Sequence, residues 1–241
     1  MADEAVTATA ILKRLRLLAN PRDAENCRRF FKTGPGEYGE GDIFLGIRVP
    51  AMRKFVREIR DDVSLETASE LLQGKFHEAR LLALMLMVEL FEQADDSAKR
   101  EIYAAYLSHT SHINNWDLVD SSAAPIVGGW LFTRDRRPLY KLAKSNSLWE
   151  RRIAVIATFH FIRKNDFADT LKLCELLLRD DHDLMHKACG WMLREVGKRD
   201  VKTLEAFLEK HAAQMPRTML RYAIEKFPEP RRQKFLRAGR P

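Results

Sequence analysis

The chain has 241 residues, of which 46% are hydrophobic and 31% are charged, and this balance excludes a chain dominated by disorder. No apolar run approaches the roughly 20 residues of a membrane span, and the charged first 18 residues resemble an amphipathic helix instead of a signal peptide. The three cysteines, Cys27, Cys174 and Cys189, are odd in number and lack CxxC spacing. We therefore expect an intracellular, cytoplasmic protein without a disulfide framework.

The net charge of +7 is unevenly placed along the chain. Residues 187–241 contain 14 lysines and arginines against 6 acidic residues, whereas the rest of the chain carries a net charge of −1. Basic surfaces of this kind attract phosphate backbones by Coulomb attraction and counterion release. The placement favours a nucleic-acid partner, and a merely solvated basic surface is the alternative.

Helix signals follow one another from end to end. Pro50 opens a helix with apolar residues at 3,4 spacing as far as residue 59, and Ser64 is a candidate N-cap for a helix ending at residue 72. Further helices are expected at 76–91, 99–107, 115–131, 148–162, 166–178, 183–196, 201–211 and 216–227. No stretch shows sustained alternation of apolar and polar residues, so the sequence predicts an all-α protein.

The helices also repeat along the chain. Arg80, Trp116, Arg152, Lys187 and Arg221 occupy matching positions, with steps of 36, 36, 35 and 34 residues. A near-constant period of this length predicts stacked helix pairs, roughly six in number, that form a single solenoid domain over residues 1–241. Stacking aligns the matched positions on one face, which is cationic apart from Trp116. We interpret this column as a phosphate-tracking groove; solubility is the other explanation.

Residues 34–42 form the Gly-rich part of the chain, and residues 228–241 form a basic tail. The sequence at 34–39, GPGEYG, matches GxGxxG literally. A dinucleotide site is not expected there, because no strand precedes it, Pro35 stiffens the turn and nearby carboxylates repel a pyrophosphate. An exposed, mobile loop is the prediction.

No metal site or familiar nucleophile motif is expected. His182 and His186 lie one helical turn apart, as do His109 and His112, but neither pair has an obvious third ligand. The motifs of serine hydrolases, zinc proteases and P-loop proteins are absent.

The strongest chemical signal is the segment at 115–120, NWDLVD. Trp116 and Asp120 share one face of the expected helix by their spacing of four residues. A fixed carboxylate stabilises the positive charge that builds on a sugar losing its base, and an aromatic face attracts cations. The alternative is that Trp116 packs in the core and Asp120 is a structural hydrogen-bond acceptor.

Three local motifs resemble the AlkD-type DNA alkylation repair glycosylases, a family of HEAT-like helical repeats. They are FLGIRVP at 44–50, WDLVD at 116–120 and KACGWMLRE at 187–195, and WERR at 149–152 matches a W-x-x-R of the family. The resemblance spans about residues 29–227. It differs at Phe30, which stands where relatives place a DNA-facing tyrosine, and in a longer insertion around residues 34–41.

The resemblance implies a HEAT-like solenoid with a basic concave face and a set of site residues. Asp120 is the implied catalytic carboxylate, Trp116 and Trp191 flank the nucleotide, and Arg152, not Arg151, holds a backbone phosphate. The further DNA-contacting residues expected from the motifs and the repeat column are Phe30, Arg48, Arg80, Lys187, Arg194 and Arg221.

The expected function is hydrolysis of the N-glycosidic bond of N3- or N7-alkylated purines in double-stranded DNA, with neither metal nor organic cofactor. Such bases are already cationic, so the reaction needs no general acid. We expect a monomer that associates with the nucleoid when bound to DNA. A non-catalytic nucleic-acid-binding repeat protein and a protein-interaction scaffold are the alternatives.

Overall fold

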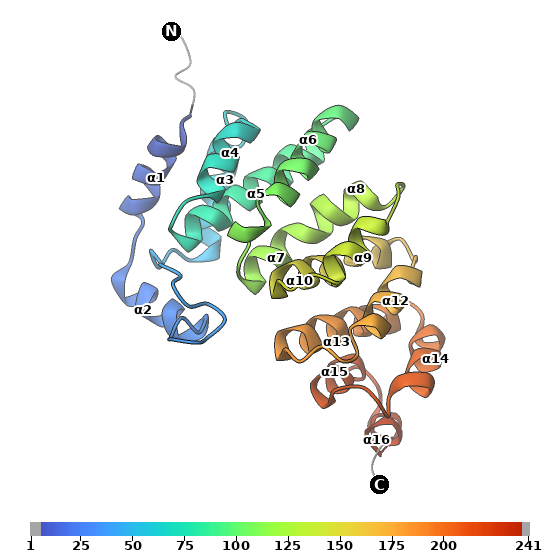
Figure 1. Ribbon diagram of the computed structural model, residues 1–241. Coiled ribbons are helices and arrows are strands. Elements are labelled where there is room, and N and C mark those ends of the chain that lie inside the picture. The colour runs from blue at the N-terminus through green and yellow to red at the C-terminus, as the bar shows by residue number, and fades with distance from the viewer. Residues whose placement is uncertain (1–5, 238–241) are drawn as a thin grey trace. The chain divides into compact units, whose positions relative to one another are not determined.

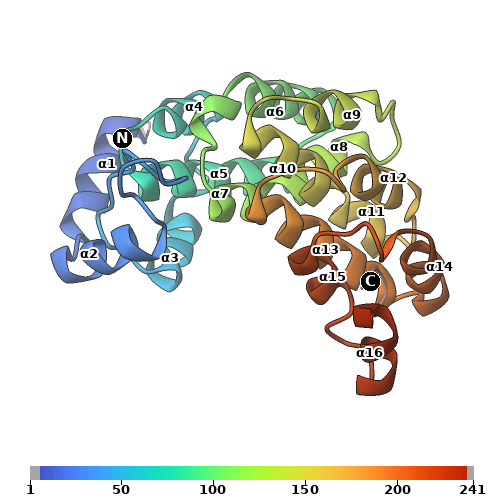
Figure 2. The same ribbon diagram turned by 60° about the horizontal axis from the view of Figure 1, so that its bottom comes forward.

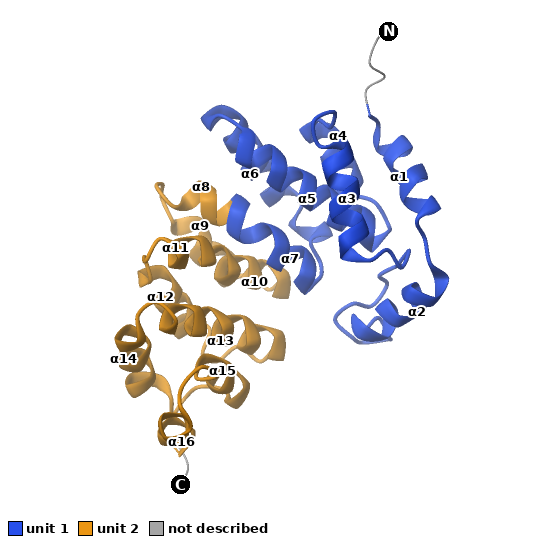
Figure 3. Ribbon diagram, turned by 180° about the vertical axis from the view of Figure 1, so that it is seen from behind, with its two compact units in different colours: residues 1–126 blue, residues 127–241 orange. Residues whose placement is uncertain are grey.

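The computed structural model describes residues 6–237 and is helical throughout that range (Figure 1). The described residues contain no strand, and only an isolated bridge links Ile43 to Phe76. The all-α prediction is therefore confirmed. The chain divides into two compact units, residues 1–126 and 127–241 (Figure 3).

Unit 1 contains seven α-helices in its described part. They are α1 (Ala8–Leu17), α2 (Pro21–Phe30), α3 (Val49–Ile59), α4 (Leu65–Leu72), α5 (His77–Gln93), α6 (Asp96–Ser108) and α7 (Trp116–Ala123), with the 3₁₀ turn η1 (Thr110–His112) before α7. Helices α3, α5 and α7 lie side by side, and α4 packs on α5 (Figure 2). Helix α5 is apolar on nearly every side because it is the central helix of this unit.

A five-residue π-helical stretch, η2 (Ala124–Gly128), continues α7 directly into α8 (Gly129–Leu131). Unit 2 continues with α9 (Arg137–Ala143), α10 (Leu148–Ala157), α11 (Phe159–Arg163), α12 (Ala168–Leu176), α13 (Asp183–Gly197), α14 (Val201–His211), α15 (Arg217–Ala223) and α16 (Glu229–Arg237). Helices α10, α13 and α15 pack one after another, and we call them the inner row of this unit. Helices α9, α12 and α14 pack against that row (Figure 2).

Short polar side chains start many of these helices, as the sequence predicts. Ser64 accepts a hydrogen bond from the Thr67 amide, and Asp95, Ser147 and Asp200 cap their helices in the same way. Each such cap contributes about 1 kcal/mol. These residues fix where a helix begins, and the apolar face fixes which side is buried.

The repeat is present within each unit. Arg80 and Trp116 lie on the neighbouring helices α5 and α7, and Arg152, Lys187 and Arg221 lie on α10, α13 and α15. Gly190 permits the closest of these approaches, because a Cβ there meets the Met219 carbonyl oxygen of α15 at 2.5 Å. The prediction of one solenoid domain with a basic concave face stays a prediction.

Several boundaries differ from the sequence-based expectation. The helix expected at 148–162 is two helices, which meet at Thr158, and the helix expected at 216–227 ends at Ala223. Helices α2 and α9 were not predicted, and residues 229–237 of the expected basic tail form α16. Helix α2 buries only Ala24 and α9 has seven residues, so neither shows a sustained apolar pattern at 3,4 spacing, although each starts with a proline that favours a first helical turn.

Candidate functional site on helix α7

Trp116 and Asp120 occupy consecutive turns on one side of α7. The helix begins there because Asn115, which is extended, caps it with a side-chain oxygen that accepts from the Trp116 amide at 2.8 Å. Both site residues are partly exposed, whereas Leu118 and Val119 between them are buried. The indole and the carboxylate therefore lie at the surface of a helix whose other side is held in the core.

The Trp116 ring ends a stack of aromatic groups. Its centroid lies 5.3 Å from that of Phe31 at an interplanar angle of 24°, and Phe31 stacks on Phe44 at 5.1 Å. Phe44 stacks on the His77 imidazole at 4.5 Å. Phe30, 65% exposed, contacts the edge of the indole with its centroid 5.8 Å away. The stack fixes the plane of Trp116 and leaves Phe30 as an apolar neighbour facing solvent.

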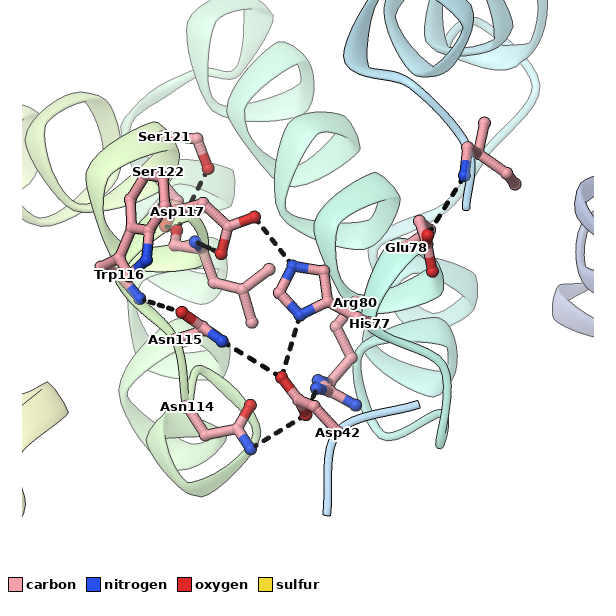
Figure 4. A network of polar contacts seen from close by, with 12 residues as sticks. Asp42, His77, Glu78, Arg80, Asn114, Asn115, Trp116, Asp117, Ser121 and Ser122 are labelled. Atoms are coloured by element: carbon pink, nitrogen blue, oxygen red, sulfur yellow. Dashed lines mark hydrogen bonds and ion pairs between the residues drawn. The ribbon is translucent and has the colours of Figure 1, made fainter. Parts of the chain in front are cut away.

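A buried polar network lies behind this stack (Figure 4). The His77 imidazole, 2% exposed, is 3.0 Å from the Asp42 carboxylate through Nδ1 and 2.8 Å from Asp117 through Nε2. Arg80 forms a short ion pair with the other oxygen of Asp42. The Asn115 amide donates to Asp42 at 3.3 Å, so the residue that caps α7 belongs to the same network.

The two carboxylates keep His77 charged. Burial alone lowers the pKa of an imidazole, but hydrogen bonds and Coulomb attraction from Asp117 and Asp42 outweigh it and raise the pKa of His77 to about 9. Burial raises the pKa of Asp42, and the opposing contacts of His77 and Arg80 leave that pKa below its usual value. The network is thus an imidazolium and a guanidinium facing two carboxylates at neutral pH.

Glu78 orders the segment that leads into α3. Its buried carboxylate accepts from the amides of Leu45, Gly46 and Ile47 at 2.8, 2.7 and 3.2 Å. Gly46 has a φ of 80°, and a Cβ there meets the Asn20 carbonyl oxygen at 2.2 Å. The backbone of the motif at 44–50 therefore contacts both the start of α2 and the Glu78 side chain of α5.

The charge of Asp120 acts on Tyr106 of α6. The pKa of the fully buried Tyr106 hydroxyl is raised, first by burial and then in part by the negative charge of Asp120. Tyr106 also lies 3.0 Å from the Ser122 hydroxyl, which ties α6 to α7. Asp120 is thus partly exposed and close enough to the buried Tyr106 for its charge to act on that phenol.

Two of the predicted DNA-contacting residues in unit 1 differ in their surroundings. Arg80 is 5% exposed, and besides Asp42 it donates to the carbonyl oxygens of Gly74 and Lys75. Its guanidinium is a member of the internal network, and the DNA contact of Arg80 stays a prediction. Arg48 is exposed and pairs with Asp23 at 2.9 Å.

The predicted residues of unit 2 lie on its inner row. Arg152 is buried on α10 and donates to the Leu184 carbonyl oxygen at 2.6 Å. Trp191 is partly exposed, and its ring centroid lies 5.9 Å from that of Phe159. Arg151, which the sequence comparison sets aside, pairs with the buried carboxylate of Asp180. The phosphate contact of Arg152 stays a prediction.

The basic residues of α13 and α15 are engaged to different degrees. Lys187 pairs with Asp183 one turn earlier at 2.6 Å, and Arg194 pairs with Glu225. Arg221 is exposed and has no ion pair with the described residues. Surface pairs of this kind contribute little to stability and exchange readily for phosphate.

Sequence reasoning missed Asp42, His77 and Glu78. Asp42 was placed in an exposed loop, and this is wrong for that residue, which is 7% exposed, although most of 34–41 is exposed or partly so. The available signal was weak: a histidine and a glutamate opening an otherwise apolar helix. Their partners lie more than 30 residues away, beyond any local pattern.

The described part of the chain has neither a membrane-spanning helix nor a cluster of metal ligands. No helix in residues 6–237 is long and apolar enough to cross a membrane. Nor do three or more histidine, cysteine or acidic side chains in that range gather in an arrangement suited to a metal ion.

Comparison with known proteins identifies the family. Residues 11–227 match the family model described as DNA alkylation repair enzyme. A predicted DNA alkylation repair enzyme from Enterococcus faecalis has the same fold, with a TM-score of 0.68 over 88% of this chain and 97% of that one, at 16% identity. No curated protein matches. The chain belongs to the DNA alkylation repair enzyme family.

Proposed function

We propose that this member of the DNA alkylation repair family is a glycosylase that hydrolyses the N-glycosidic bond of N3- or N7-alkylated purines in double-stranded DNA. The observation that carries the proposal is the pairing of Trp116 with Asp120 on one exposed side of α7, fixed from behind by the aromatic stack and the charged network. A helix with only a packing role does not require an indole and a carboxylate together on its partly exposed side.

The chemistry needs a carboxylate and water. Alkylation at N3 or N7 makes the purine a cation, so it departs with the electron pair of the glycosidic bond as a neutral base. The sugar left behind is oxocarbenium-like, and a carboxylate next to it stabilises the positive charge. Water then adds to C1′ and loses its proton, leaving an abasic site. In this scheme Asp120 supplies the negative charge and orients the water.

Trp116 contributes recognition. An indole face attracts cations by about 0.5 to 2 kcal/mol, more when water is excluded. Trp116 is held rigid by Phe31, so little side-chain entropy is lost when a charged base lies against it. Phe30 widens this apolar surface, and its missing hydroxyl removes one polar contact with the DNA backbone.

Unit 2 supplies the remaining proposed contacts. Arg152 holds a phosphate near the lesion and Trp191 flanks the nucleotide, in the roles that the family motifs imply. Lys187, Arg194 and Arg221 contact the backbone, and Arg48 does so from unit 1. We propose that the protein acts as an intracellular monomer and needs no cofactor.

The test is release of N7-methylguanine or N3-methyladenine from methylated duplex DNA by the wild type and by Asp120→Asn. We expect the variant to bind undamaged duplex as tightly as the wild type and to lose about 100-fold or more in the rate of base release. Asp62→Asn, which removes an exposed carboxylate elsewhere in unit 1, is the charge-matched control and should retain full activity.

Equal rates for Asp120→Asn and the wild type would remove Asp120 from the mechanism. Tight binding of DNA without base release by the wild type would identify a non-catalytic DNA-binding protein. Absence of both would favour a protein-interaction scaffold.

A further inference from the structure

Unit 1 contains a basic groove that belongs to neither the aromatic stack nor the charged network. It is a pocket of about 390 Å³. Its lining includes two arginines of α3, the arginine that caps α3, two apolar residues and a carboxylate of α5, and a hydroxyl of α7: Arg53, Arg57, Arg60, Met85, Val88, Glu89 and Ser121. We call this pocket the arginine groove.

The arginines of the groove carry an uncompensated charge. Arg53, Arg57 and Arg60 follow one another at spacings of four and three residues, so they share one side of α3. Arg60 pairs with Glu89 at 2.8 Å, while Arg53 and Arg57 are exposed and form no ion pair with any described residue. The groove therefore holds about two positive charges in excess.

Several other arginines of the same unit have carboxylate partners, unlike Arg53 and Arg57. Arg14, Arg48 and Arg80 each have a carboxylate partner, at Glu58, Asp23 and Asp42. A buried donor of the groove is also unused, because Nε of Arg60 has no hydrogen-bond partner. Arg16, Arg22 and Arg100 are also exposed without an ion pair to any described residue, so what distinguishes Arg53 and Arg57 is that they line one pocket together with Arg60.

The groove leads to the catalytic pair of α7. Ser121 directly follows Asp120, and α3, α5 and α7 lie side by side in this unit. A phosphodiester backbone lying across Arg53 and Arg57 would therefore contact α7 at the residue after Asp120. The apolar side chains of Met85 and Val88 form a floor against which a deoxyribose can pack.

We infer that the arginine groove binds the phosphodiester backbone of the DNA duplex next to the lesion, as a phosphate site of unit 1 in addition to the contact proposed for Arg48. Guanidinium groups match phosphate oxygens in a fork geometry with two parallel hydrogen bonds. The inference rests on the proposed function for its biological purpose, but the binding is measurable on undamaged DNA.

The experiment measures the affinity of the full chain for a fluorescent undamaged duplex over a salt series from about 0.05 to 0.2 M. Each phosphate contact contributes about 0.9 to the slope of log K against log salt, so Arg53→Gln/Arg57→Gln should lower the slope by about 1.8. We expect its affinity to fall roughly 10- to 100-fold at the lower salt. Glutamine preserves helix propensity, and neither arginine is buried.

The matched control removes the same charge outside the groove. Lys54→Gln/Arg100→Gln changes an exposed residue of α3 and an exposed residue of α6, neither of which lines the pocket. This control should change the slope by less than the groove variant, because long-range attraction between exposed charges is screened beyond about 10 Å. A circular dichroism melt confirms that both variants are folded.

The outcomes separate this inference from the proposed function. If the wild type binds DNA and both double variants weaken it equally, the groove is not a backbone site, whatever the enzyme does. If the groove variant alone binds weakly, the inference holds even when the wild type releases no base. Selective loss of binding to an oligoglutamate, with DNA binding unchanged, would identify an acidic peptide as the occupant and overturn the inference.

Discussion

The two units hold their predicted site residues in different ways. In unit 1, Trp116 rests on an aromatic stack that ends at His77, and His77 is buried between two carboxylates. In unit 2, Lys187 pairs with Asp183 across one turn of a regular helix at the surface. Unit 1 keeps ions in its interior to fix one helix end, whereas unit 2 keeps several of its cations at the surface.

This difference fits the roles proposed above, with positioning of the carboxylate in unit 1 and attraction of the DNA backbone in unit 2. A carboxylate that stabilises a transition state has to be placed to within a fraction of an ångström, and buried networks provide such rigidity. Cations that track a flexible phosphate chain need reach, and exposed side chains provide it. The comparison predicts that mutations of equal charge have unequal effects in the two units.

The largest effect is expected from His77→Gln. The variant leaves Asp42 and Asp117 with one counter-charge fewer in a buried site, which costs about 3 to 5 kcal/mol of unfolding free energy. Urea denaturation followed by circular dichroism measures it. Hydrogen exchange should locate the loss at α5 and at the start of α7. A loss below about 1 kcal/mol would show that the network does not anchor α7.

A smaller effect is expected from pH. The pKa of His77 is about 9 in the folded chain and about 6.5 when unfolded, so the folded state holds a proton that the unfolded state releases between these values. The resulting stabilisation is complete below about pH 6.5 and is lost as the pH rises through about 9. The expected change is on the order of 2 to 3 kcal/mol.

Urea denaturation of the wild type and of His77→Gln at about pH 6, 7.5 and 9 tests this linkage. The variant should show a flatter profile over this range, because it lacks the imidazole whose pKa differs between the folded and unfolded states. Parallel profiles for the two proteins would exclude His77 as the source. At acid pH the lowered pKa of Asp42 acts in the opposite direction, since its contribution is lost as that carboxyl becomes protonated.

The smallest effect is expected from Lys187→Gln in unit 2. The ion pair with Asp183 is exposed, so its loss should change the unfolding free energy by less than about 1 kcal/mol. By contrast, the salt slope of DNA binding should fall by about 0.9 if Lys187 contacts one phosphate. A large loss of stability with an unchanged slope would reverse the assignment of roles between the units.

The sequence predicted the elements better than it predicted the interior. Periodicity and capping residues such as Ser64 located most helices, because those signals act within one or two turns. The equal spacing of Arg80, Trp116 and Arg152 placed them on helices α5, α7 and α10 but did not predict their burial. Arg80 and Arg152 are both buried, and Arg80 pairs with Asp42, 38 residues away.

The shared helical face of Trp116 and Asp120 was predictable from their spacing, but the aromatic stack that holds Trp116 was not. Asp120 follows Trp116 by four residues, which any helix turns into a shared face. The stack of Phe31, Phe44 and His77 depends on the path of residues 31–44, where the glycines leave many conformations open. Tertiary contacts choose among these conformations, and no local pattern records the choice.

The segment that joins α2 to the motif at 44–50 has one further consequence. Its first end is fixed by Phe31 in the stack and its second by Asp42 and the amides held by Glu78. The turn between them adds only closure entropy, and doubling its length costs about 0.6 kcal/mol. Insertions or deletions in that turn should therefore leave the positions of Trp116 and Asp120 on α7 unchanged.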